Sequence, residues 1–421
     1  MERVCYAKNG IPIYSYKNEG SHGFYLSLFL KSGSMYESED ECGITHFFEH
    51  IAIRNINYNM GGTLYSVLDK YGLEFNASTY SEMVQFYLSG AESNFGAAAD
   101  ILARLLLPVS LPRCEVDRER DRIRAEIREA DEKSSLAGFT AGVVHGGTSL
   151  SRQITGTPRA VGRITAKRLE EYRRRVFSPQ NLFIYITGNV KDGDIERLSD
   201  LVGAYPLFPC AEHNNIAPVP QNFGKRGANV ALKNADFTKV RFTFDVDMTS
   251  VATEEIDLLY DILLGGYSSG FFIELSENRG LFYDLTGQVE RYRNIGTFSF
   301  SYELRESKLP LAVKCTVDEL VAIKNTLLAP EKCMKAGYVD NAYMLLDDNA
   351  ALNFTFAYDN CILGLGYPDI AARQRKYALV TPERIMSAAR KIFTPDNLTL
   401  TIKGNKRRID TEEIRKILLE L

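Results

Sequence analysis

The sequence has no long hydrophobic run and no excess of one charge sign, and these two absences exclude two classes of partner. The longest apolar stretch, residues 101–111, is too short for a membrane helix and contains Arg104. Fifty Lys and Arg residues against 54 Asp and Glu residues give a net charge of −4, so no general field recruits nucleic acid or an anionic membrane. The partner of this chain must therefore be identified from a local site.

Paired cysteines and a secretion signal are also missing. The seven cysteines are odd in number, widely scattered and never arranged as C-x-x-C, which is typical of reduced thiols. Residues 1–6 do not follow the basic and then apolar plan of a signal peptide. We therefore expect a cytoplasmic protein that binds neither nucleic acid nor membrane.

A repeat at an offset of 216 residues organises the chain. Residues 164–189 align with residues 380–405 without a gap, and ten of the aligned positions are identical. Both copies predict a Thr-capped helix, a turn at Ser/Thr-Pro and an alternating strand. The duplication predicts two homologous α+β domains, residues 1–204 and 229–421, joined by a proline-containing linker at 205–228.

Hydrophobic periodicity predicts the main elements of each half. Strands are expected at residues 23–31, 84–89, 239–247 and 296–302. Helices are expected at residues 44–53, 64–71, 95–107, 113–132 and 164–176.

Histidine is scarce: the chain has five, and the last of them is His213. Two of them, His46 and His50, form an H-x-x-E-H motif with Glu49. Residues four apart share one face of a helix, so both imidazoles can bind one metal ion. Glu49 is placed to accept the proton of an attacking water, whose acidity zinc raises. H-x-x-E-H is itself a recognised zinc peptidase motif.

A third metal ligand is expected on the charged helical segment further along the chain. Glu119 and Glu126 lie seven residues apart there and so share a helix face. Glu126 is the candidate third ligand, and Glu119 the candidate for a hydrogen bond to a ligand or to substrate. Alone, these two glutamates would indicate only a solvated helix face, but the histidine motif favours a metal site. Two histidines and a glutamate favour Zn²⁺ over other divalent ions.

The remaining histidines have no partner at ligand spacing and are interpreted as ordinary surface or loop residues; they are His22, His145 and His213. Phe47 and Phe48 are interpreted as core residues that pack the motif helix. Since the second half contains no histidine, it cannot repeat the metal site. We expect it to shape a chamber, hold substrate or mediate assembly.

The motif and its surroundings resemble the pitrilysin/insulinase family of zinc peptidases, in the shorter branch that includes mitochondrial processing peptidase. The resemblance extends over nearly the whole chain. It includes residues 33–37 and 42–50 and the spacing from His50 to Glu119 and Glu126. The resemblance implies two α+β domains that form half of a clamshell chamber, closed by a second, similar chain.

A glycine pair and the segment Phe-Asn-Ala-Ser-Thr at residues 75–79 are also similar to this family. In the family this segment is an edge strand on which substrate is laid by main-chain pairing. The resemblance therefore implies substrate-binding roles for Asn76 and Ala77. A turn or strand-end role for Asn76 is the alternative.

In the second half, residues 264–269 and 279–283 are similar to the family's C-terminal signature. There an Arg and a Tyr hold substrate and stabilise the oxyanion. Tyr283 matches the Tyr, whose hydroxyl can donate to the tetrahedral intermediate, although a purely structural role stays open. Ser276 stands where the family often has the Arg. This departure favours a heterodimer with a similar subunit over a homodimer.

The leading interpretation is a zinc metalloendopeptidase that cuts peptides or unfolded segments, for example in peptide maturation. The main alternative is a non-catalytic scaffold or core subunit of the same fold, against which the complete set of ligands and base argues. A third interpretation, a nucleic-acid binder that uses the basic residues of segment 167–175, is weaker. Those charges are more consistent with a solvated helix face, because the chain as a whole is acidic.

Overall fold

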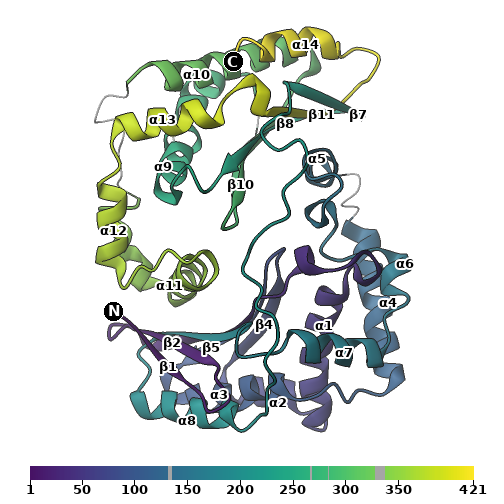
Figure 1. The fold of residues 1–421 in the computed structure, drawn as a ribbon, viewed down its shortest axis with the longest axis vertical. Helices are drawn as coiled ribbons and strands as arrows, with labels where there is room; N and C mark the ends of the chain where they lie inside the picture. Colours follow the sequence, from purple (N-terminus) through teal and green to yellow (C-terminus); the bar gives the residue numbers. More distant parts are fainter. Residues whose placement is uncertain (131–134, 266–267, 283, 328–336) are drawn as a thin grey trace. The chain divides into compact units, whose positions relative to one another are not determined.

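The computed structural model describes residues 1–130, 135–265, 268–282, 284–327 and 337–421. The chain forms two compact units, each of which contains a β-sheet and helices (Figure 1). Unit 1 comprises Met1–Asp131, Arg152–Asn215 and Tyr343–Ile370. Unit 2 comprises Glu132–Ser151, Ile216–Ala342 and Ala371–Leu421. Each unit therefore contains a segment from the opposite half of the sequence.

The strands of unit 1 are β1 (Glu2–Tyr6), β2 (Pro12–Lys17), β3 (Gly23–Leu30), β4 (Glu74–Thr79), β5 (Val84–Ala91) and β6 (Leu182–Gly188). Its helices are α1 (Ile44–Asn59), α2 (Leu64–Tyr71), α3 (Phe95–Ala103), α4 (Arg113–Ala130), α6 (Pro158–Val161), α7 (Ala166–Val176), α8 (Asp192–Gly203) and α11 (Asn349–Phe356). The predicted helix 44–53 is thus six residues longer, and the predicted helix 95–107 ends as a 3₁₀ turn over Arg104–Leu106.

The strands of unit 2 are β7 (Asn229–Asn234), β8 (Thr238–Asp247), β9 (Asp284–Arg291), β10 (Ile295–Leu304) and β11 (Leu398–Gly404). Helices α5 (Leu136–Val144), α9 (Thr253–Leu264), α10 (Leu309–Asn325), α13 (Pro382–Ile392) and α14 (Thr411–Leu418) lie in this unit, and α12 (Ile370–Ala378) begins at its border. None of the helices in the described residues is long and apolar enough to cross a membrane.

The two sheets share one topology, as the duplication predicts. Their strand orders are β1-β2-β6-β3-β5-β4 and β7-β11-β8-β10-β9, which correspond once β1 is set aside. In each sheet one pair is parallel, β2 with β6 and β7 with β11, and the neighbouring pairs are antiparallel. The order leaves β4 at one end of the sheet of unit 1.

The aligned repeat forms the same structure twice. Helix α7 and strand β6 correspond residue by residue to α13 and β11 at the offset of 216. Both helices begin at a Thr whose side chain accepts a hydrogen bond from the amide three residues later, Thr165 from Arg168 and Thr381 from Arg384. Asn181 also donates its side-chain amide to the carbonyl oxygen of the last residue of α7.

One face of each sheet is covered by a helix from the opposite half of the sequence. In unit 1, α11 packs on β3 and β6, on the face opposite α3 (Figure 1). The Asn353 side chain accepts from Ser27 Oγ at 2.9 Å and donates to the carbonyl oxygens of Tyr25 and Tyr185. In unit 2, α5 packs on the corresponding strands β8 and β11, where the hydroxyls of Thr140 and Thr401 lie 2.6 Å apart.

The N-terminus of α1 is fixed by a buried carboxylate. Glu37 accepts from the amide N–H groups of Gly43 and Thr45, each at 2.8 Å. Burial raises the pKa of Glu37 to about 7, although these two donors act in the opposite direction. The Thr45 hydroxyl also lies 3.0 Å from the Tyr172 hydroxyl. The first turn of α1, which carries His46, is therefore fixed both by Glu37 and by Tyr172.

Gly43 is required at this position by its conformation and by its surroundings. Its φ is 89°, and an added Cβ would lie 2.8 Å from both Gly156 Cα and Thr155 O. We expect Gly43→Ala to cost roughly 2–4 kcal/mol and to lower the urea midpoint. The matched control is Gly142→Ala on α5, where a Cβ meets nothing within 4 Å and helix propensity improves. Equal midpoints for the two variants would contradict this account of Gly43.

Candidate metal centre

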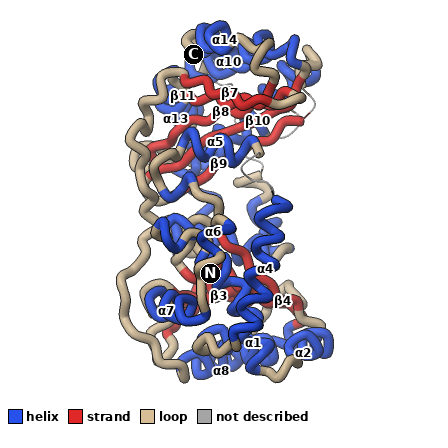
Figure 2. Tube along the Cα trace, turned by 90° about the vertical axis from the view of Figure 1, so that its right-hand side faces the viewer, coloured by secondary structure: helices blue, strands red, loops and turns tan. Residues whose placement is uncertain are grey.

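The predicted metal-binding residues lie on two neighbouring helices of unit 1. His46 and His50 are one turn apart on α1, and Glu126 lies on α4, which packs beside α1 (Figure 2). The imidazoles are largely buried, with 10% and 16% of their side-chain surface exposed, whereas the Glu126 side chain is 44% exposed. The site is therefore open on the Glu126 side.

The three side chains converge at distances that suit one metal ion. His46 Nε2 lies 3.5 Å from Glu126 Oε1, and His50 Nε2 lies 3.6 Å from Glu126 Oε2. Two ligands that bind one zinc ion at about 2.0–2.1 Å in tetrahedral geometry are about 3.3 Å apart. Among the described residues, His46, His50 and Glu126 form a group of three His, Cys, Asp or Glu side chains that could hold a metal ion.

The protonation state of His46 also fits metal binding. Burial, helped by the neighbouring His50, lowers the pKa of His46 to about 4, while Glu49 acts in the opposite direction. The imidazole is therefore neutral at pH 7, and a nitrogen lone pair is available for a metal ion. Its Nδ1 is buried and has no hydrogen-bond partner in the described structure. Two imidazoles and a carboxylate are a donor set that zinc prefers.

Glu119 contacts the second histidine, on the side away from Glu126. Its Oε2 lies 3.3 Å from His50 Nδ1, and the residue is only 5% exposed. The hydrogen bond from His50 lowers the pKa of Glu119, against the effect of burial, and the cation of Arg54 lowers it further. Glu119 is thus an ionised acceptor that can hold Nδ1 of His50 protonated and leave Nε2 free.

Glu49 is held by a residue that the sequence analysis did not identify. Thr79, the last residue of β4, donates its hydroxyl to Glu49 Oε2 at 2.5 Å. Asn76 and Ala77 lie on the same strand, and the Ala77 amide donates to Asn76 Oδ1 at 2.9 Å. The strand that carries the predicted substrate-binding residues is therefore directly connected to the predicted base.

The second-half positions of the family signature and the histidines outside the motif lie apart from the candidate metal group. Tyr283 lies outside the described residues. Ser276 lies in a π-helical turn over Phe272–Glu277. His145 is the C-cap of α5, and burial lowers its pKa, whereas the ring of His213 lies 4.3 Å from that of Tyr36.

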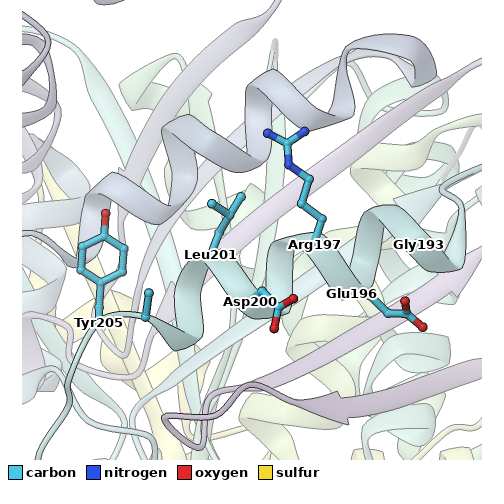
Figure 3. A pocket seen from close by; sticks show the side chains of 7 residues that line it. Gly193, Glu196, Arg197, Asp200, Leu201 and Tyr205 are labelled. Atoms are coloured by element: carbon cyan, nitrogen blue, oxygen red, sulfur yellow. The ribbon is translucent and has the colours of Figure 1, made fainter.

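A shallow pocket of about 570 Å³ lies elsewhere in unit 1, along α8 (Figure 3). Glu196, Asp200 and Tyr205 line it, and Arg197, which also lines it, is paired with Asp100 at 2.8 Å. None of its lining residues is a predicted site residue. The metal centre is thus a set of converging side chains outside this pocket.

The comparisons with known proteins agree with this geometry. The sequence profile described as Insulinase (Peptidase family M16) matches residues 13–149, and that of the Peptidase M16 inactive domain matches residues 163–333. The chain belongs to the insulinase family of peptidases. The first profile covers α1 and α4 with the candidate ligands, and the inactive-domain profile covers most of unit 2's sheet.

Relatives within the insulinase family are distant but cover most of the chain. An uncharacterized zinc protease of Streptomyces coelicolor is 25% identical over 381 residues, 87% of this chain and 82% of that protein. Another, of Rickettsia bellii, is 23% identical over 400 residues, 93% of this chain and 92% of that protein. A Helicobacter pylori protease structure has a TM-score of 0.81 at 16% identity and covers 96% of this chain and 99% of its own. At such identities the solved structure shows the fold alone, which is the predicted α+β fold.

Proposed function

We propose that this chain is a zinc-dependent metalloendopeptidase in which His46, His50 and Glu126 hold the metal ion. The observation that carries the proposal is the convergence of these three side chains next to Glu49. The relatives in Streptomyces coelicolor and Rickettsia bellii are named zinc proteases, which supports zinc as the metal. Zinc, when bound, supplies a Lewis acid that polarises the scissile carbonyl and acidifies water.

The protein's own residues supply the proton transfer. Glu49 accepts the proton of the attacking water and returns it to the leaving amine. The hydroxyl of Thr79 donates to Glu49 Oε2, which leaves Oε1 as the oxygen that would accept from the water. A group held in this way needs little reorganisation when the reaction occurs.

The position of β4 supports a peptide or an unfolded segment as substrate. Because β4 is an end strand of its sheet, its outer edge can accept an extended chain by main-chain hydrogen bonds. Asn76 and Ala77 would then contact the substrate beside Glu49. A folded protein rarely offers a free extended segment, which favours peptides over folded substrates.

The proposal includes a second, similar subunit and a cytoplasmic location. Ser276 in place of an Arg supports a partner chain that supplies the substrate contact of the missing Arg. A heterodimer would supply the missing group more directly than a homodimer. The free state of the cysteines in the described residues supports a reducing compartment.

The test is a peptidase assay on a mixed peptide library together with zinc analysis, for the chain alone and with a similar chain from the same source. We expect about one zinc ion per chain and cleavage that increases when the second chain is added. Zinc binding without cleavage in any pairing would instead indicate a non-catalytic subunit of the same fold. A chain that binds no zinc would contradict both functions.

A further inference from the structure

Arg54 lies on the face of α1 that packs against α4, the same face that carries His46 and His50. It follows His50 by one helical turn, as His50 follows His46, so the three share a face of the helix. Its guanidinium contacts two carboxylates of α4. The Arg54 Nη1 lies 3.2 Å from Glu119 Oε1, and its Nη2 lies 2.6 Å from Glu115 Oε2.

The contact with Glu115 fixes the direction of the guanidinium. Arg54 Nε also donates to Glu115 Oε2, at 2.7 Å. Glu115 is held in turn by Arg118, whose Nη1 lies 2.8 Å from Glu115 Oε1. Glu115 and Glu119 are one turn apart on α4, so Arg54 joins two successive turns of that helix. Because Nε and Nη2 are engaged by Glu115, Nη1 is presented to Glu119.

Both oxygens of Glu119 are consequently occupied. Oε1 accepts from Arg54 and Oε2 accepts from His50 Nδ1, at 3.2 and 3.3 Å. The Glu119 side chain is only 6% exposed, so water does not readily replace either partner. A carboxylate held at both oxygens has little freedom to rotate, and the ring of His50 is oriented by it.

We propose that Arg54, anchored by Glu115, is a positioning residue for zinc binding that acts through Glu119 on His50. Arg54 holds the Glu119 carboxylate in place, and Glu119 keeps the His50 ring turned with Nε2 towards Glu126. The inference rests on the zinc site of the proposed function but does not require peptidase activity. Sequence spacing alone did not assign a role to Arg54 or Glu115.

The test compares Arg54→Met with Arg54→Lys and with a remote control. Methionine keeps much of the aliphatic length and removes the charge, whereas lysine keeps the charge and loses the forked contact. The control is Arg197→Met, which removes an Arg–Asp pair between two other helices of unit 1, α8 and α3. The readouts are the zinc dissociation constant, from competition with a chromophoric chelator, and the absorption spectrum of the Co²⁺-substituted chain.

We expect Arg54→Met to weaken zinc binding by up to about 10-fold, less than the roughly 10- to 100-fold cost of losing Glu119, the outer-shell partner that contacts His50 directly, and to alter the Co²⁺ spectrum. Arg54→Lys should recover part of the loss, and Arg197→Met should bind zinc like the unmodified chain. Unchanged zinc affinity in folded Arg54→Met would overturn the inference and leave the zinc site standing. An unmodified chain without zinc affinity would overturn the zinc site and the inference together.

A double-mutant cycle separates positioning from a structural role. If Arg54 acts through Glu119, Arg54→Met combined with Glu119→Ala should bind zinc no more weakly than Glu119→Ala alone. Additive losses would overturn the proposed route. Should Arg54→Met fail to fold, Glu115→Ala provides the same test, because it keeps the charge of Arg54 but removes the carboxylate that anchors it. A smaller loss of zinc affinity in Glu115→Ala supports the inference, and no loss overturns it.

Discussion

Replacement of Glu49 by Gln is expected to lower the rate of peptide cleavage by about 10²- to 10⁴-fold, the usual contribution of a general base, and to leave zinc bound. The amide keeps the size of the side chain and can still accept from Thr79. It cannot accept the proton of the attacking water. The measurement is kcat on a peptide that the unmodified chain cleaves, with the zinc content of each preparation determined in parallel.

Glu39→Gln is the matched control for this experiment, because Glu39 is an exposed carboxylate of the same unit outside the predicted site. It should cleave peptides at the unmodified rate. A Glu49→Gln chain that retained both its zinc and its activity would exclude Glu49 as the base. Loss of zinc from Glu49→Gln would instead indicate that Glu49 contributes to the metal site.

Replacement of Glu126 by Gln is expected to weaken zinc binding by more than the roughly 10- to 100-fold cost of an outer-shell change, and to abolish cleavage at low zinc. The reason is that a neutral amide replaces the one negatively charged ligand of the site. Zinc affinity from chelator competition measures the effect, and added zinc should restore part of the activity.

Glu129→Gln controls for the general loss of a negative charge on α4. Glu129 follows Glu126 by three residues and is exposed. Its replacement should leave zinc affinity unchanged. If Glu126→Gln and Glu129→Gln bound zinc equally well, Glu126 would not be a ligand.

The elements that carry the site could be predicted because local patterns determine them. The repeat predicted α7, β6, α13 and β11, because a capping threonine and an alternating apolar pattern can be recognised from neighbouring residues alone. The end of α1 was predicted too early, since asparagines are poor helix formers. In the structure Asn55 donates to Pro108 O and accepts from the Ser110 amide, so tertiary hydrogen bonds extend the helix.

The predicted ligands converge because their spacings place them on single helix faces. His46 and His50 share a face of α1, and the seven-residue spacing of Glu119 and Glu126 places both on the side of α4 that faces α1. Thr79 could not be identified in this way, because its contact with Glu49 depends on how β4 packs against α1. Arg54 had a recognisable signal, namely its spacing of four residues from His50, but its partners lie more than sixty positions away.

The exchange of helices between the halves of the sequence was not predictable either. An apolar helix face indicates that a helix is covered by a sheet but does not indicate which sheet. The residues that decide it are few. Asn353 finds all its partners on β3 and β6 of unit 1, although it lies in the second half of the chain.

This exchange constrains the engineering of the molecule. A cut between residues 205 and 228 would leave the first fragment without α11 and the second without α5, the helices that cover their sheets. The two fragments should therefore need each other for solubility and should remain associated after nicking.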